Sequence, residues 1–252
     1  MVVDTIFTFQ YPIMLLMAIG VMAVLYSSVG HGGASGYLAA MALWGLLPEE
    51  MRPAALLMNI VVTSWLLYRF QPYELMPSKL FWPLVIASTP LAFIGGLVKI
   101  DAEAYRFLVG AMLLLAAVRM LTISKDAEST QQPAMVLVLL VGAVLGFSAG
   151  LTGIGGGVFL SPIMLIFGWC TIRQSTAVAA GFILLNSVGG LAGYVVSDQS
   201  WPMGTGWLVA AALVGCLFGS ELAAHRASSL TLQKLLAAVL VIAAVKMVVT
   251  AL

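Results

Sequence analysis

The chain has 252 residues, of which 62% are hydrophobic and 8% are charged, whereas roughly a quarter of the residues are charged in an ordinary soluble domain. Its mean hydropathy of +1.09 leaves too few polar side chains to cover a surface that faces water. A net charge of +1 argues against a basic surface for nucleic acid. We therefore expect an integral membrane protein, and an all-α one, because an open strand in lipid would leave its backbone groups unpaired.

Five apolar segments are expected in the first half of the chain. They cover about residues 11–29, 37–47, 53–70, 80–98 and 104–123. The segment 37–47 is too short to cross the roughly 30 Å hydrocarbon core at about 1.5 Å per residue. We expect it to be a broken or re-entrant helix, which leaves both eight and ten membrane passes open.

A polar stretch, 124–133, separates this half from a second one with the same order of segments. We expect a first repeat at 1–123, an aqueous linker at 124–133 and a second repeat at 134–252. The short segment of the second half is expected at 158–169. If each short segment completes a crossing with a neighbour, each half has an odd number of passes and the halves are inverted.

The evidence for a repeat is a constant offset of 123 positions between the halves. It places Gly30, Gly32 and Gly33 on glycines, and it matches further residues without a gap. The matched pairs are Gly30–Gly153, Gly32–Gly155, Gly33–Gly156, Met41–Met164, Gly45–Gly168, Ile60–Ile183, Ser64–Ser187 and Gly96–Gly219. Paired halves in an apolar chain are typical of secondary transporters.

Each glycine cluster precedes a short helix, so it predicts an exposed helix N-terminus within the membrane. Glycines allow the chain to turn without side chains, and the positive end of the helix that follows binds anions. The candidate binding residues in the clusters are Gly30, His31, Gly32, Gly33, Ser35, Gly153, Gly155, Gly156 and Gly157. The alternative interpretation is that these glycines serve close helix packing.

Neutral polar side chains follow each cluster. We expect Asn59, Thr63, Asn186 and Ser187 to bind substrate oxygens. The pairs Thr63-Ser64 and Asn186-Ser187 coincide at the repeat offset, so they should lie at the same depth in both halves. The alternative is ordinary hydrogen bonding between helices.

His31 is the candidate for proton coupling. The stretches 5–48 and 129–172 contain no Asp, Glu, Lys or Arg, and His31 is the only histidine in either. A histidine titrates near physiological pH. The alternative is a neutral imidazole bonded to a backbone carbonyl. Arg52 and Arg173 follow the short segments, where they either attract anions or serve as orientation signals that reach the interface.

The two halves resemble the TauE/SafE family in their paired G-x-G-G clusters, each followed by a short helix and then by a helix that carries Ser, Thr or Asn. The second cluster, with Pro162 and Gly168 after it, matches the family pattern well, whereas the first carries His31 in place of Ile154 and Ala34 in place of Gly157. The resemblance implies a multi-pass protein of the bacterial inner membrane. It also implies transport of sulfite, sulfonates or related organosulfur anions.

The expected function is secondary transport of small sulfur-containing anions, held between the two glycine-rich helix N-termini. An anion channel for similar substrates is the first alternative. The second is an intramembrane serine protease, because Gly33-Ala34-Ser35-Gly36 matches the G-x-S-G motif of rhomboids and His225 could act as a base.

The sequence has no Walker motif, so we do not expect ATP to be the direct energy source. We expect no enzymatic activity, no cofactor and no metal, and membrane lipid and another copy of the chain as further contacts.

Overall fold

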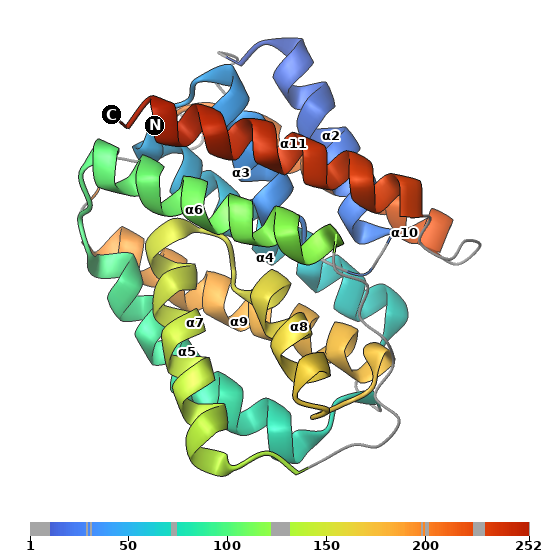
Figure 1. Cartoon of the computed structure of the whole chain (residues 1–252). Coiled ribbons are helices and arrows are strands. Elements are labelled where there is room, and N and C mark those ends of the chain that lie inside the picture. Colours follow the sequence, from blue (N-terminus) through green and yellow to red (C-terminus); the bar gives the residue numbers. More distant parts are fainter. Residues whose placement is uncertain are drawn as a thin grey trace.

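The computed structural model describes residues 11–28, 30, 32–71, 75–121, 132–197, 199, 202–223 and 230–251. These residues form ten α-helices and no strand, with five helices on each side of the stretch 124–133 (Figure 1). The helices are α2 (Ile13–Ser27), α3 (Ala34–Trp44), α4 (Pro48–Phe70), α5 (Ser78–Leu97), α6 (Ala102–Leu121), α7 (Met135–Thr152), α8 (Gly157–Ile166), α9 (Ile172–Val196), α10 (Thr205–Ala223) and α11 (Leu230–Val249).

Five of the helices are long and apolar enough to cross a membrane within the part of the chain that the structure describes. They are α4, α5, α7, α9 and the stretch Thr205–Leu222 of α10. The helices α3 and α8 have 11 and 10 residues, so at about 1.5 Å per residue neither can cross the hydrocarbon core alone. The expectation of an all-α membrane protein is confirmed.

The helices α4 and α9 run side by side in opposite directions through the centre of the molecule. Tyr194, near the end of α9, donates from Oη to the backbone carbonyl of Glu49 at the start of α4, over 3.2 Å. Further along both helices, Asn59 Nδ2 lies 3.3 Å from Ser187 Oγ. The residues of α4 and of α9 that match at the repeat offset therefore lie on two antiparallel helices.

The last helices of the two halves, α6 and α11, also lie side by side in opposite directions (Figure 1). Arg106 at the start of α6 donates from Nη1 to the carbonyl of Thr250 just after α11, over 3.1 Å. One turn further along α6, Gly110 faces Ala244 and Met247. Because Gly110 has no side chain, the two backbones approach closely.

Small residues allow equally close packing between the halves. On α7, three glycines spaced by four residues face the α5 backbone with no room for a Cβ: Gly142 on Leu84, Gly146 on Ser88 and Gly150 on Ala92. On α10, Gly215 and Gly219 pack in the same way on α2. The fourth helix of each half thus packs parallel to the first helix of the other half, α5 on α7 and α10 on α2.

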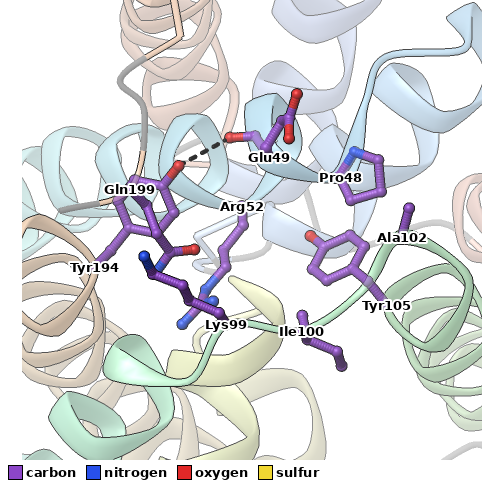
Figure 2. Close-up of a pocket in the computed structure, with 9 residues that line it drawn as sticks. All are labelled: Pro48, Glu49, Arg52, Lys99, Ile100, Ala102, Tyr105, Tyr194 and Gln199. Carbon is purple, nitrogen blue, oxygen red and sulfur yellow. Dashed lines mark hydrogen bonds between the residues drawn. The ribbon is translucent and has the colours of Figure 1, made fainter. Parts of the chain in front are cut away.

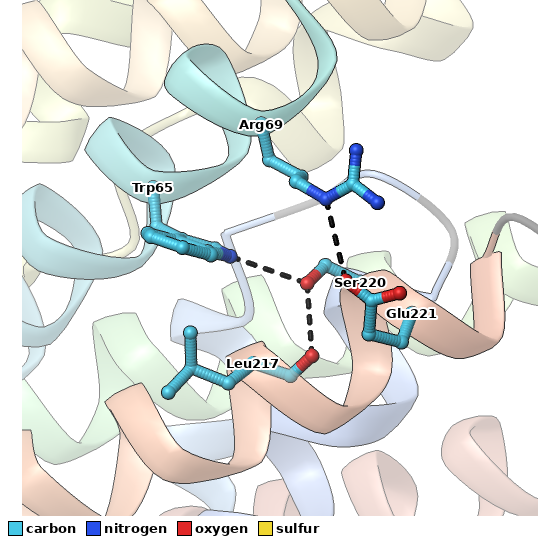
Figure 3. A network of polar contacts seen from close by, with 5 residues as sticks. All are labelled: Trp65, Arg69, Leu217, Ser220 and Glu221. Atoms are coloured by element: carbon cyan, nitrogen blue, oxygen red, sulfur yellow. Dashed lines mark hydrogen bonds and ion pairs between the residues drawn. The ribbon is translucent and has the colours of Figure 1, made fainter.

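Polar contacts hold α4 to α10 near their C-terminal ends (Figure 3). Trp65 Nε1 donates to Ser220 Oγ over 3.2 Å, and Ser220 Oγ donates to the Leu217 carbonyl over 2.9 Å. One turn further on, Arg69 Nε lies 3.3 Å from Glu221 Oε1. Because both of these charged side chains are exposed, the ion pair contributes at most about 1 kcal/mol.

The start of α4 differs from the expected boundary, because the helix begins at Pro48 rather than at Pro53. Proline suits the first helical position, and the Glu50 carboxylate accepts from the Leu47 N–H over 3.0 Å. Within the helix, Pro53 has no N–H for the Glu49 carbonyl. Tyr194 donates to that carbonyl instead, so the proline leaves no group unpaired.

Candidate functional site

Each short helix is preceded by a glycine whose backbone lies in the left-handed region. Gly33 precedes α3 with φ 87°, and Gly156 precedes α8 with φ 76°. A side chain would be strained at either position. The two turns leave the first N–H groups of α3 and α8 without partners in their own helices, and they carry the positive ends of the helix dipoles.

Both glycine clusters reach the same surface of α4 and α9. A Cβ on Gly32 would lie 2.9 Å from Thr63 Cγ2 and 3.3 Å from Asn59 Oδ1. A Cβ on Gly155 would lie 2.8 Å from Asn59 Nδ2 and 3.4 Å from Ser187 Oγ. The first cluster and the second, far apart in sequence, therefore lie on opposite sides of one asparagine. Ile183 contacts both glycines as well.

Asn59 is fully buried and only partly hydrogen-bonded. Its Nδ2 donates to the Gly153 carbonyl over 3.4 Å and to Ser187 Oγ over 3.3 Å. Its Oδ1 has no hydrogen-bond partner among the described residues. Thr63 is buried beside it, but its hydroxyl donates to the Asn59 carbonyl over 2.6 Å. The Asn59 amide thus leaves only its acceptor, Oδ1, without a partner among the described residues, whereas the Thr63 hydroxyl is engaged in its own helix.

Asn186, on the same helix as Ser187, is fully buried with neither side-chain atom hydrogen-bonded to a described residue. A buried amide without partners is costly. Ser64 differs from its counterpart, because it lies on the exposed face of α4 whereas Ser187 is buried. The two polar pairs therefore differ in burial, because Asn186 and Ser187 are both buried whereas Thr63 and Ser64 face different sides of their helix.

The remaining predicted residues lie around this centre. Gly30 faces Thr176 at the start of α9, and Gly157 faces Ile183. Ser35 is buried in the first turn of α3, where its Oγ lies 2.8 Å from Tyr26 Oη. His31 and His225 lie outside the described residues.

Tyr37 is a residue of this site that the sequence reading missed. Its Oη lies 2.8 Å from the position that a Cβ on Gly33 would take, and the side chain is fully buried. This hydroxyl has no partner among the described residues. The only signal in the sequence was its place one turn after the glycine cluster, which an apolar helix would also explain.

Arg52, for which the sequence left attraction of anions and an orientation signal at the interface open, has a buried side chain. It lies in the second turn of α4 and is 2% exposed. Its guanidinium donates to the carbonyls of Gly150, Val98 and Gly95 over 2.9, 2.9 and 2.5 Å. These carbonyls belong to the last turns of α7 and α5, which attract cations, and this explains why the side chain turns inward.

Two cavities open beside the glycine clusters. One, of about 550 Å³, is lined by Gly30, Arg173 and Thr176 among others. The other, of about 320 Å³, is lined by Arg52 and Lys99 together with Tyr105, Tyr194 and Gln199 (Figure 2). Arg173, unlike Arg52, is exposed. The described residues contain no cluster of His, Cys, Asp and Glu that could hold a metal ion, and Cys170 and Cys216 are buried, as their apolar surroundings predict.

The comparison with protein families matches residues 14–247 to the sulfite exporter TauE/SafE family. A probable membrane transporter protein of Sinorhizobium fredii is 32% identical, over 92% of this chain and 96% of its own. Probable membrane transporter proteins of Methanocaldococcus jannaschii and Haemophilus influenzae are 26% and 27% identical, over 79% and 96% of this chain and 78% and 98% of their own. No solved structure matches the chain significantly. Together with its apolar spans, these matches show that the chain is a multi-pass membrane transporter that belongs to the sulfite exporter TauE/SafE family.

Proposed function

We propose that the chain carries small sulfur-containing anions, such as sulfite or sulfonates, across the cell membrane. The anion would bind between Gly32 and Gly155, where the N-termini of α3 and α8 approach the same side chain, Asn59. The family description, sulfite exporter, supports this substrate class.

The observation that carries the proposal is the convergence of both glycine clusters on Asn59. Two positive helix ends next to each other repel unless an anion lies near them. Broken helices that meet within the membrane bind anionic groups in repeat-built transporters. Two donors without a partner among the described residues, Asn186 Nδ2 and Tyr37 Oη, could bind oxygens of such an anion in the same region.

The neutrality of these side chains suits a carrier. Among the described residues, the hydroxyl and amide groups that face the glycine clusters carry no charge. A cationic side chain would hold an anion tightly, whereas neutral donors and helix ends allow it to leave. Asn59 Oδ1, which has no partner among the described residues, could accept from an N–H or O–H group on the substrate, such as the amino group of an amino-sulfonate.

The arrangement of the helices supports an inverted pair of repeats. Helices that hold the same place in the order of the two halves, α4 with α9 and α6 with α11, pack in antiparallel pairs. In an inverted pair, the site lies between the halves and movement of one half against the other exposes it alternately to the two sides.

Transport into proteoliposomes tests the proposal. Purified full-length protein is reconstituted, and the uptake of radiolabelled sulfite, taurine, methanesulfonate and acetate is compared with that of sodium ions. We expect uptake of at least one sulfur anion and acceleration by the same anion inside the vesicles, which a carrier shows and a channel does not. Movement of sodium ions without any of the anions would overturn the proposal.

A further inference from the structure

Arg52 is a buried cation that no carboxylate neutralises among the described residues. The only ion pair recorded there joins Arg69 to Glu221. The three backbone carbonyls that accept from Arg52 compensate for part of its desolvation, but they carry no full negative charge. Of the five N–H groups of a guanidinium, three donate to these carbonyls, which leaves two without a hydrogen bond to a described residue.

The cavity of about 320 Å³ beside Arg52 places a second cation near the first (Figure 2). Lys99, exposed just after α5, lines this cavity, and so do the side chains of Tyr194 and Gln199. Glu49 lines it too, but Figure 2 shows the Glu49 carboxylate directed away from the Arg52 guanidinium. The cavity thus combines two cations with neutral hydrogen-bonding groups and with one carboxylate, that of Glu49, which points away from the guanidinium.

This cavity adjoins the second glycine cluster. A Cβ on Gly153 would lie 3.0 Å from the backbone oxygen of Arg52 and 3.4 Å from its Cα. The guanidinium also binds the end of α7, next to the turn that leads to Gly153. An anion at Arg52 would therefore lie next to the second glycine cluster.

We infer that the cavity lined by Arg52 and Lys99 is a second anion-binding site, at which a small oxyanion binds before it reaches the central site or after it leaves. The inference rests on the proposed function and adds a separate site to it. The guanidinium binds two oxygens of the anion with its remaining N–H groups, because its planar donors match such a pair. Lys99 supplies a flexible charge at the entrance, which raises the local concentration of anions.

The test changes the exposed lysine, because Arg52 also holds helices together. Lys99→Gln is compared with Lys79→Gln, an exposed lysine near the start of α5 that does not line this cavity. Sulfite uptake is measured in vesicles of zwitterionic lipid. We expect Lys99→Gln to raise the KM for sulfite about two- to fivefold, as loss of one solvent-exposed charge contact does, with kcat unchanged. Lys79→Gln should match the wild type, and the difference should shrink at high salt.

Direct binding distinguishes the two sites. Equilibrium dialysis of purified full-length protein against radiolabelled sulfite in neutral detergent should show binding that Asn59→Ala reduces but does not abolish. Adding Lys99→Gln or Arg52→Gln to the Asn59→Ala variant should weaken the sulfite binding that remains. Size-exclusion chromatography is the control for folding. Lys79→Gln is added to the same variant as the control. Equal behaviour of Lys99→Gln and Lys79→Gln in both assays would overturn the inference while the proposed function stands.

Two further outcomes also decide the question. Anionic lipid headgroups carry oxyanions as well, so uptake is repeated in vesicles that contain phosphatidylglycerol. An effect of Lys99→Gln seen only in those vesicles would assign the cavity to a lipid and overturn the inference. If the wild type moves none of the sulfur anions, the proposed function fails, and the inference fails with it.

Discussion

Asn59 on α4 donates a hydrogen bond from Nδ2 to Ser187 Oγ on α9, and this contact joins the two halves of the chain beside Gly155. Both partners are fully buried. The contact fixes the face that the asparagine amide presents to the two glycine clusters. It therefore links helix packing to the proposed binding of the anion.

Removal of the Ser187 hydroxyl tests this link. Ser187→Ala should raise the KM for the transported anion about fivefold, because one hydrogen bond contributes about 1 kcal/mol and its loss frees the Asn59 amide to rotate. Ser64→Ala is the matched control, since Ser64 lies at the equivalent sequence position but on the exposed face of α4. Equal effects of the two substitutions on KM would contradict the role of the Asn59–Ser187 contact.

Much of this architecture could be predicted from sequence, because it depends on local patterns. Long apolar segments must be helical in lipid, and the glycine clusters mark where α3 and α8 begin. The inward direction of Arg52 could not be predicted in this way. It depends on carbonyls at the ends of α5 and α7, which only the packing of helices from both halves brings to the start of α4.

The repeat offset was informative about helix order but misleading about individual side chains. It equates Ser64 with Ser187, yet one is exposed and the other buried. The neighbours of a helix face are set by the other half of the molecule, and matched positions differ where those neighbours differ. Tyr37 could not be predicted for a related reason, since only the packed structure shows that its buried hydroxyl has no partner among the described residues.

Substitution of the cluster glycines should stop transport. Gly155→Leu introduces a side chain at φ +77°, against Asn59 and Ile183. Gly32→Leu introduces a side chain against Thr63 and Asn59. Both should reduce uptake to background. Gly20→Ala is the control, because a Cβ there would lie 3.6 Å from its nearest neighbour. Folding is checked by size-exclusion chromatography, and well-folded Leu variants with full uptake would refute both the binding and the packing roles of the clusters.

Tyr37→Phe separates substrate binding from structural support. The Tyr37 hydroxyl is buried without a described partner, so its removal should leave thermal stability unchanged or raise it. If it donates to the anion, the KM should rise by about fivefold, the equivalent of one hydrogen bond. Tyr26→Phe is the comparison, because it breaks the 2.8 Å contact with Ser35 and should lower stability. Unchanged KM in Tyr37→Phe would remove Tyr37 from the site.

Ser35→Ala distinguishes a carrier from an intramembrane protease. Because the Ser35 hydroxyl is bonded to Tyr26, its loss should cost about 1 kcal/mol of stability and leave anion uptake within about fivefold of the wild type. Purified wild-type protein is also incubated with a fluorescent membrane-embedded peptide. Cleavage that disappears in Ser35→Ala would identify a nucleophile and contradict the carrier.

His31 remains the candidate for proton coupling, as the only histidine in the two stretches without Asp, Glu, Lys or Arg. It follows Gly30 and precedes Gly32, whose neighbours are Thr63 and Asn59. A protonated imidazole at this position would add positive charge beside the anion, so that one proton and one anion would cross together. Transport driven by a pH gradient should therefore require a group that titrates, whereas exchange of one anion for another should not.

The substitution His31→Gln keeps a hydrogen-bonding side chain of similar reach and removes the titration. Accumulation of radiolabelled sulfite against its gradient, driven by an imposed pH difference, should be lost. Counterflow exchange at equal pH on both sides should persist within about fivefold, because a neutral hydrogen bond to the anion remains possible. His225→Gln serves as the matched control, since His225 is the only other histidine in the chain. Unchanged proton-driven accumulation in His31→Gln would assign the coupling to another group or ion, because a side chain that cannot titrate cannot carry the proton.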